Sequence, residues 1–243
     1  VDERLTSAFG ADRAPVALLG GGFHRRKHSS LMGSARTSLY FAGVRRICDE
    51  RGVLFMVDEV QTGLGRYGRW FAHQHFGVVP DVVTMAKALG NGVPIGACWA
   101  RDEVAAAFEP GDHATTYGGQ PFAAAAARAV LAVMAENDVA SLAETKGAQL
   151  SARLSELSAV RAVRGLGLLL AVEIDVDRTG VPAATIASLL LERSLVVNAV
   201  TPTALRLAPS LLISDDEIDH AVTVLSATLD ELVDANDATP EPT

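Results

Sequence analysis

The chain has 243 residues, of which 49% are hydrophobic and 21% are charged, and its formal net charge is −8 at pH 7. This length can bury the core of one domain or of one and a half. The acidic balance argues against a nucleic-acid partner, and the lack of an apolar run of ~20 residues argues against a membrane span. The first residues lack the basic and apolar regions of a signal peptide, so we expect a cytoplasmic protein.

The chain has two cysteines, Cys48 and Cys98, which lie far apart in the sequence. Their separation suits neither a metal site nor a disulfide framework. We expect both to be buried free thiols in a reducing compartment.

Short apolar runs rich in β-branched residues predict the strands of the first half of the chain. Runs of this length, bounded by turn residues, are typical of strands that are buried on both faces of a parallel sheet. Helices are predicted where apolar residues recur at helical spacing, and Gly52 is expected to end the first of them. The expected strands are 15–19, 53–57, 82–85 and 95–100, and the expected helices are 40–51, 102–108 and 120–136.

The second half of the chain predicts a small α+β domain behind a linker helix. Its last helix opens with Ser214 and Glu217 at the spacing of a capping box, in which each side chain bonds the other residue's backbone. The expected helices are 139–157, one that begins at 182, and 214–233, and the expected strands are 160–164, 168–174, 195–199 and 204–208. We therefore divide the chain into a partial large domain (1–137), a small C-terminal domain with its linker helix (138–234) and a disordered tail (235–243).

Two charged residues follow neighbouring predicted strands. Asp58 comes after the run 53–57, and Lys87 comes after the run 82–85. In a parallel sheet, ligands gather beyond the carboxyl ends of the strands. A lysine there can form a Schiff base with an aldehyde cofactor, while a carboxylate keeps a ring nitrogen protonated. The plainer alternative is that Asp58 caps a turn and Lys87 is a solvated residue at the start of a helix.

Three other stretches carry candidate anion-binding groups. The hydroxyls of 113–121 precede a predicted Ala-rich helix, which suits a phosphate, but capping by Thr115 or Thr116 explains them equally well. Arg206 lies within an apolar strand pattern, so it needs an anionic partner, either a nearby acid or a bound carboxylate. The basic stretch 23–37 is typical of a solvated loop.

Four sequence strings, in the same order, resemble the class III, fold type I, pyridoxal-phosphate aminotransferases. They are VDEVQTGLGR (57–66), PDVVTMAKALGNGVPIGA (80–97), GDHATTYGGQPFAAAAARAV (111–130) and NAVTPTALRLAPSLLIS (198–214). The resemblance covers residues 40–234 and implies an α/β fold, with a fold type I large domain whose mostly parallel sheet is incomplete and a small α+β C-terminal domain. It also implies pyridoxal 5′-phosphate as the cofactor and a homodimer with shared active sites.

The resemblance implies a role for each candidate site residue. Lys87 holds the cofactor and moves the proton, and Asp58 pairs with the ring nitrogen. The other implied positions are Phe23 stacked on the ring, Glu59 behind the site, Val60 and Gln61 against the ring, Thr116 on the phosphate of the neighbouring subunit's cofactor, and Arg206 on the substrate α-carboxylate.

The strings are most similar to those of the aminotransferases that move the ω-amino group of N2-acetylornithine to 2-oxoglutarate in arginine biosynthesis. The alternative amino donors are 4-aminobutyrate and ornithine. Two family segments have no counterpart between Arg36 and Tyr40. One is a Glu-Pro-hydrophobic-Gln-Gly-Glu-Gly run, and the other is the loop that holds the phosphate. A shortened, non-catalytic homologue that keeps the fold and the dimer surface is therefore the second hypothesis.

Overall fold

The computed structural model describes residues 16–20 and 35–238. The chain divides into two compact units, 1–140 and 141–243. The first unit contains a mixed, mostly parallel sheet with helices. The second contains an antiparallel sheet with helices. Both agree with the predicted α/β fold and its small α+β domain. Within the described ranges, no helix is long and apolar enough to cross a membrane.

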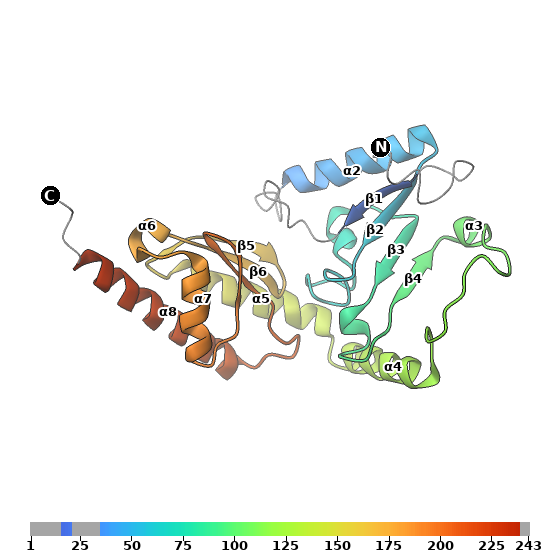
Figure 1. Ribbon diagram of the computed structural model, residues 1–243. Coiled ribbons are helices and arrows are strands. Elements are labelled where there is room, and N and C mark those ends of the chain that lie inside the picture. The colour runs from blue at the N-terminus through green and yellow to red at the C-terminus, as the bar shows by residue number, and fades with distance from the viewer. Residues whose placement is uncertain (1–15, 21–34, 239–243) are drawn as a thin grey trace. The chain divides into compact units, whose positions relative to one another are not determined.

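The first unit is built on a four-stranded sheet in the order β1-β2-β3-β4 (Figure 1). The first three strands run parallel, and β4 runs antiparallel to β3. The strands predicted at 53–57 and 82–85 are therefore direct neighbours. The strands are β1 (Val16–Gly20), β2 (Leu54–Asp58), β3 (Val82–Met85) and β4 (Ala97–Ala100), and the helices are α2 (Ala35–Arg51), η1 (Ala72–Phe76), η2 (Lys87–Leu89), α3 (Asp102–Ala105) and α4 (Pro121–Glu136).

Helix α3 ends three residues before the predicted end at 108. The backbone N–H groups of Ala107 and Phe108 bond carbonyls three residues back, so the last turn tightens. Pro110 follows closely, and the residue before a proline is disfavoured in the α-helical conformation. These two effects explain the early end of the helix.

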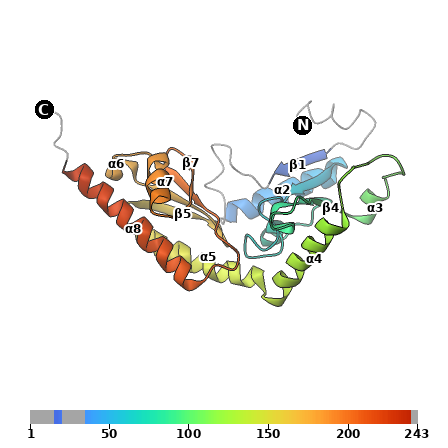
Figure 2. The same cartoon turned by 60° about the horizontal axis from the view of Figure 1, so that its bottom comes forward.

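The apolar core of the first unit lies between α2 and the sheet. Figures 1 and 2 both show α2 beside β1 and β2. The ring of Phe41 on α2 stacks on Phe76 at a centroid distance of 4.4 Å. Cys48 is buried in this core, as predicted, but Cys98 is exposed, because it lies on β4, whose residues 97–99 are all exposed. The buried members of the core are Phe41, Cys48, Phe55, Val57 and Val78.

A buried carboxylate, Asp81, joins β2, β3, β4 and α2 at the start of β3. Its Oδ2 accepts hydrogen bonds from the backbone N–H of Phe55 and from Arg45 Nη1, both at 2.7 Å. Its Oδ1 accepts from Arg101 Nη1 at 3.0 Å. Burial raises the pKa of Asp81, but these donors outweigh it and hold the pKa below its usual value. The carboxylate is therefore ionised in the folded protein and ties four elements together.

The second unit is an antiparallel sheet in the order β5-β6-β8-β7. Its existence matches the α+β domain predicted from the second half of the sequence. The strands are β5 (Val160–Leu166), β6 (Leu169–Ile174), β7 (Asn198–Thr201) and β8 (Ala204–Leu207), and the helices are α5 (Val139–Ser155), α6 (Val176–Thr179), α7 (Ala183–Glu192) and α8 (Asp215–Asp237).

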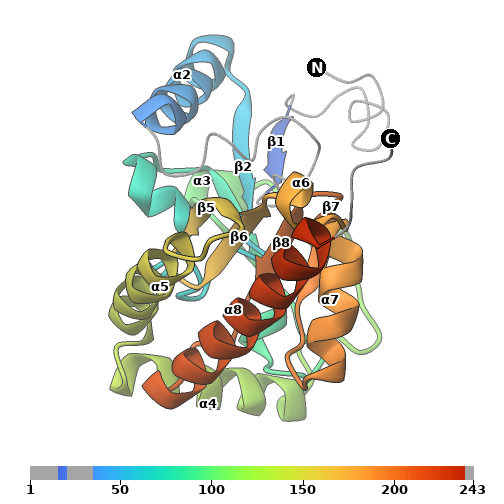
Figure 3. The same cartoon turned by 90° about the vertical axis from the view of Figure 1, so that its left-hand side faces the viewer.

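Three helices cover one face of this sheet. Figure 3 shows α5, α8 and α7 side by side in front of the strands. Alternate residues of β6, namely Leu170, Val172 and Ile174, are buried against them, as the two-residue period of a strand requires. Ion pairs also link α5 to α8, through Lys146 with Asp215 and Arg153 with Asp219.

Helix α8 begins as predicted and ends later than predicted. Ser214 Oγ accepts from the backbone N–H of Glu217, and Glu217 Oε2 accepts from the backbone N–H of Ser214 at 2.8 Å, so the capping box is confirmed. The helix continues to Asp237, four residues past Val233. Asn236 Nδ2 donates to the carbonyl oxygens of Asp177 and Arg178, which anchors the last turn. The tail predicted at 235–243 thus begins inside the helix, and residues 239–243 lie outside the described part.

The helix α5 is expected to tolerate no side chain at Gly147. A Cβ at this position would lie 2.0 Å from the carbonyl oxygen of Gly167, which is backbone and cannot rotate away. We expect Gly147→Ala to lower the free energy of unfolding by about 2–3 kcal/mol, despite the better helix propensity of alanine. The matched control is Gly43→Ala in α2, where nothing lies within 4 Å of the new Cβ. It should raise stability by about 0.5–1 kcal/mol in the same urea titrations. Equal effects of the two substitutions would contradict the close approach.

Candidate active site

The sheet of the first unit brings Asp58 and Lys87 to the same edge. Asp58 is the last residue of β2 and pairs with Thr84 on β3. Lys87 follows the end of β3 by two residues and opens the short helix η2. Because β2 and β3 are parallel neighbours, their carboxyl ends meet on one side of the sheet. This is the edge at which open α/β sheets bind ligands.

Among the residues that the structure describes, only one of the two oxygens of Asp58 is engaged. Oδ1 accepts from the backbone N–H of Val60 at 2.9 Å and from Thr84 Oγ1 at 3.3 Å. The bond to Val60 is the turn cap considered from the sequence. Among the described residues, Oδ2 receives no hydrogen bond. The side chain is therefore oriented by one oxygen, and the other can accept a hydrogen bond from a ligand.

The backbone at Lys87 is strained. Its φ angle is +48°, in the left-handed region that costs a residue with a Cβ about 1–2 kcal/mol. The side chain is exposed, and no carboxylate in the described part of the chain pairs with it. Strained backbone that persists at a ligand-binding edge is a common feature of functional sites. Lys87 thus offers a free amine on a backbone whose conformation the surrounding structure imposes.

Glu59 is a fully buried carboxylate directly behind Asp58, and 1% of its surface is exposed. Its Oε1 accepts from the backbone N–H of His73 at 2.9 Å and lies 3.2 Å from His73 Nδ1, while Oε2 accepts from Thr62 Oγ1 at 2.5 Å. Burial raises the pKa of Glu59, but these donors outweigh it and hold the pKa below its usual value. The glutamate ties η1 to the turn that follows Asp58. The sequence placed Glu59 behind the site but missed His73 and Thr62.

The other residues predicted to bind the cofactor make few contacts that would indicate a role. Val60 and Gln61 lie partly buried in the turn after Asp58. Thr116 is exposed in the segment before α4, a helix that contacts η2. The hydroxyl of Thr115 accepts from the backbone N–H of Gly118 at 3.1 Å, which makes it the cap of a turn and not of α4. Phe23 lies outside the described residues.

Arg206 belongs to the second unit and has only a neutral partner in the described part of the chain. On β8, its Nη2 donates to Asn198 Oδ1 at 3.2 Å, and no described residue bonds its buried Nε. Among the described residues, no carboxylate lies within ion-pair distance of its guanidinium. The ion pair with a nearby acid, one of the two sequence interpretations, is therefore not found in this part of the chain. Asn198 is a contact that sequence reasoning missed.

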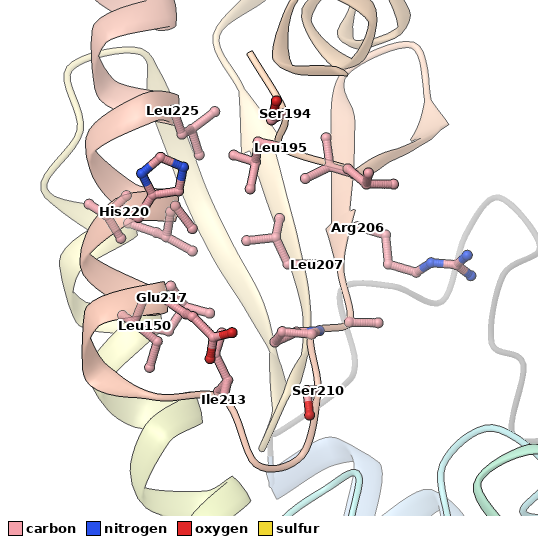
Figure 4. Close-up of a pocket in the computed structure, with 18 of the residues that line it drawn as sticks. Leu150, Ser194, Leu195, Arg206, Leu207, Ser210, Ile213, Glu217, His220 and Leu225 are labelled. Atoms are coloured by element: carbon pink, nitrogen blue, oxygen red, sulfur yellow. The ribbon is translucent and has the colours of Figure 1, made fainter. Parts of the chain in front are cut away.

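The second unit also contains a cavity of about 650 Å³ beside α8, on the helix side of β8. Figure 4 shows Leu207 and His220 directed into this space, while the guanidinium of Arg206 points away from it. Its walls are largely apolar, and Glu217 on its rim already serves the capping box. The guanidinium of Arg206 therefore lies on the opposite face of the sheet from this cavity.

Comparisons with known proteins identify the family to which this chain belongs. The family described as aminotransferase class-III matches residues 32–229, and the chain belongs to this family. An acetylornithine aminotransferase of Corynebacterium efficiens is 51% identical over 195 residues, which are 79% of this chain and 47% of that protein. The chain spans about half the length of the curated relatives it matches.

Solved structures agree with the sequence family. An ornithine aminotransferase from Toxoplasma gondii, described with partial occupancy of PLP at its active site, superposes with a TM-score of 0.75 at 33% identity, over 82% of this chain and 47% of that one. An acetylornithine aminotransferase from Elizabethkingia anophelis gives a TM-score of 0.71 at 31% identity, over 79% and 51% of the two chains. The predicted fold type I architecture is therefore confirmed, as part of the fold.

Class III aminotransferases depend on pyridoxal phosphate, and the edge of this sheet fits that group. The cofactor requires an amine for its aldehyde and a carboxylate for its ring nitrogen. The free amine of Lys87 and the open Oδ2 of Asp58 meet these two requirements on adjacent strands.

The strain at Lys87 leads to an expected order of stability between two variants that both lack the amine. Lys87→Gly should be more stable than Lys87→Ala by about 0.5–1 kcal/mol, because glycine adopts positive φ at no steric cost. At the helical Lys146 the order should reverse by about 1 kcal/mol, because alanine is the better helix former. Chemical denaturation of the four variants measures both differences. An alanine at 87 that equals or exceeds the glycine in stability would show that the backbone is not strained.

The buried Glu59 should make stability depend on pH below its ordinary pKa of 4.5. Because its folded-state pKa is lowered, it stabilises the fold above pH 4.5, and this contribution is lost as pH falls through the folded-state value. Glu59→Gln should cost about 2 kcal/mol at pH 7 and progressively less below pH 4.5. Asp81 titrates in both proteins, so the difference between their unfolding curves isolates Glu59. The exposed Glu136→Gln is the control, and a cost of Glu59→Gln that stays constant from pH 7 to pH 3 would contradict the prediction.

Proposed function

We propose that this chain carries the cofactor-binding and carboxylate-binding centre of an aminotransferase that moves the ω-amino group of N2-acetylornithine, or of a related ω-amino acid, to 2-oxoglutarate. The observation that carries the proposal is the arrival of Asp58 and Lys87 at one edge from adjacent parallel strands. The substrate class is supported by three relatives named acetylornithine aminotransferase, which are 42–51% identical to this chain. The family acts on amino acids and 2-oxo acids.

Each residue at the edge has a role that follows from its contacts. Pyridoxal phosphate, when bound, supplies an aldehyde that reacts with amines and a ring that draws off electrons. Asp58 Oδ2 accepts a hydrogen bond from the protonated ring nitrogen, while Oδ1 stays fixed by Val60 and Thr84. Lys87 Nζ holds the cofactor and then takes and returns a proton at the substrate carbon. Buried Glu59 keeps the turn behind Asp58 rigid.

The remaining contacts concern the ring faces, the phosphate and the substrate. Val60 and Gln61 follow Asp58 in the same turn and would lie against the ring of a bound cofactor. In the proposed arrangement Phe23, which lies outside the described residues, would stack on the ring, and Thr116 would reach the phosphate of the cofactor in a neighbouring subunit. The functional form would then be a homodimer in the cytoplasm. Arg206 binds the α-carboxylate of the substrate by two parallel hydrogen bonds, a role that its lack of an acidic partner in the described residues leaves open.

Two alternatives have specific support. Ornithine as the donor is favoured by the likeness to ornithine aminotransferase structures, one of which gives a TM-score of 0.75, and 4-aminobutyrate is the other alternative donor. A non-catalytic homologue that keeps the fold and dimer surface is favoured by the lack of a counterpart to the phosphate loop between Arg36 and Tyr40. The two differ in cofactor binding, since only an aminotransferase must hold the cofactor tightly.

Titration with pyridoxal phosphate tests the proposal. We expect a visible absorbance band that survives dialysis, disappears in Lys87→Ala and is retained in Lys146→Ala, which removes a lysine of the second unit that is paired with Asp215. Asp58→Asn should weaken cofactor binding at least tenfold, because a charged acceptor becomes neutral. Addition of N2-acetylornithine should then bleach the band at lower concentration than ornithine or 4-aminobutyrate. A band that is absent, or equally lost in Lys146→Ala, supports the non-catalytic homologue.

A further inference from the structure

The strand β4 is uncovered at its outer edge and on both of its faces. It is the last strand of the first sheet, and β3 is its only partner strand among the described residues (Figure 1). Successive side chains of a strand point to opposite faces, yet Ala97, Cys98 and Trp99 are all exposed. On the neighbouring β3, Val82 and Val83 are buried. The cover of the sheet therefore ends between β3 and β4.

The outer edge of β4 carries none of the features that keep strand edges from pairing. Charged side chains, prolines and bulges are the usual protection of an exposed edge. The strand Ala97–Ala100 contains no charged residue and no proline, and its register with β3 is regular. Arg101 follows directly, but its guanidinium binds Asp81 and Glu103. The edge of β4 is therefore a template to which a further strand can be added.

The helix α4 of the same unit is apolar on every side but largely exposed. Of its sixteen residues only Arg128 and Glu136 are charged. A helix that is apolar all round is typical of the interior of a larger structure. Phe122 is 73% exposed, and Leu131 and Val133 are exposed as well. The buried residues of α4 are Ala123, Ala127 and Met134. Most of the apolar surface of this helix therefore lacks a cover among the described residues.

The cover that β4 and α4 require has the size of a folded segment. An extended peptide can pair with the edge of β4, but it cannot also cover both faces of the strand and the exposed sides of α4. A second copy of this chain, paired edge to edge through β4, extends the sheet but by itself adds no cover to the faces. The chain spans about half the length of the curated relatives it matches, so an aminotransferase fold includes a further part of about this size.

We infer that β4 and α4 form the docking surface for the part of the aminotransferase fold that this chain does not match, and that this part adds a strand to the outer edge of β4. Trp99 and Phe122 are the aromatic anchors of the surface, because buried aromatic side chains supply much of the binding energy of protein interfaces. The inference rests on the family and on the exposure of these two elements. It does not depend on the roles proposed for Lys87 and Asp58.

Co-expression of the full chain with the unmatched part of a relative tests the inference. The added polypeptide is the longest continuous stretch of the Corynebacterium efficiens protein that lies outside the matched 195 residues, with any tryptophan replaced by phenylalanine. Trp70→Phe leaves Trp99 as the only tryptophan of this chain. We expect a complex of one copy of each polypeptide, in which the Trp99 emission lies at shorter wavelength than in the chain alone. Hydrogen exchange of the β4 amides should slow by about tenfold or more.

Charged substitutions at exposed positions separate docking from folding. Ala97→Lys on β4 and Phe122→Lys on α4 place a charge where the added part must exclude water, so each should weaken the complex by about tenfold or more. The matched control is Leu39→Lys on α2, a helix of the same unit, because Leu39 is 74% exposed and Phe122 is 73% exposed. The control should change the affinity by less than about twofold. Circular dichroism spectra establish that each variant is folded before its binding is measured.

Four results would overturn the inference. The added polypeptide does not co-purify with the chain, or it co-purifies without changing Trp99 emission and β4 exchange. The chain alone already shows buried Trp99 emission at every concentration, which means that another part of this chain covers β4. The emission of the chain alone shifts with its own concentration, which means that a second copy is the occupant. None of these measurements uses pyridoxal phosphate, so a failure of the proposed function, seen as a missing cofactor band, is distinguished from a failure of docking.

Discussion

The buried carboxylate of Asp81 is the interaction on which the sheet of the first unit depends. Besides the bonds from Phe55, Arg45 and Arg101 to its side chain, its backbone N–H donates to the carbonyl of Phe55 at 2.8 Å, and its carbonyl accepts from the backbone N–H of Arg101 at 3.0 Å. An ionised group in the interior is tolerated only when such donors compensate for its lost hydration. Here they come from β2, from Arg101 directly after β4, and from the covering helix. The lateral position of β2 against β3 is therefore fixed at the start of the strands.

That constraint acts at a distance on the candidate site. The register set at Asp81 carries along β2 and β3 to the pair Asp58 and Thr84, because a shift by one residue turns each strand's side chains to the other face. Such a shift would break the bond from Thr84 to Asp58 Oδ1 and would move Lys87 away from the carboxylate. The chemistry proposed for the edge therefore depends on a structural carboxylate at the other end of the same strands.

The features that sequence reasoning found are those that local pattern determines. The strands around Val57 and Val83, and the capping box at Ser214, follow from residues within a few positions of one another. Asp58 and Lys87 were found because each follows an apolar run. The role of Asp81 was missed, because its donors lie 26, 36 and 20 positions away and no short-range pattern marks them.

The same distinction explains the errors. The burial of Cys98 depends on what packs on the faces of β4, and the apolar run 95–100 does not show whether another element covers them. The late end of α8 depends on Asn236, whose acceptors lie 59 and 58 residues earlier in the chain. The partners of Glu173, Arg164 and Thr203, lie 9 and 30 positions away, so its contacts become visible only when the strands are in register.

Six charged side chains of the two units fall into two groups that differ in how many of their hydrogen-bonding atoms have a partner. In the first group, both carboxylate oxygens accept hydrogen bonds, and the carboxylate is half-buried or buried. These hydrogen bonds hold neighbouring elements together. In the second group, an oxygen, an amine or a guanidinium nitrogen has no partner among the described residues, although the backbone holds the side chain in place. Such open capacity is available to a ligand that supplies the partner. The first group is Asp81, Glu59 and Glu173, and the second is Asp58, Lys87 and Arg206.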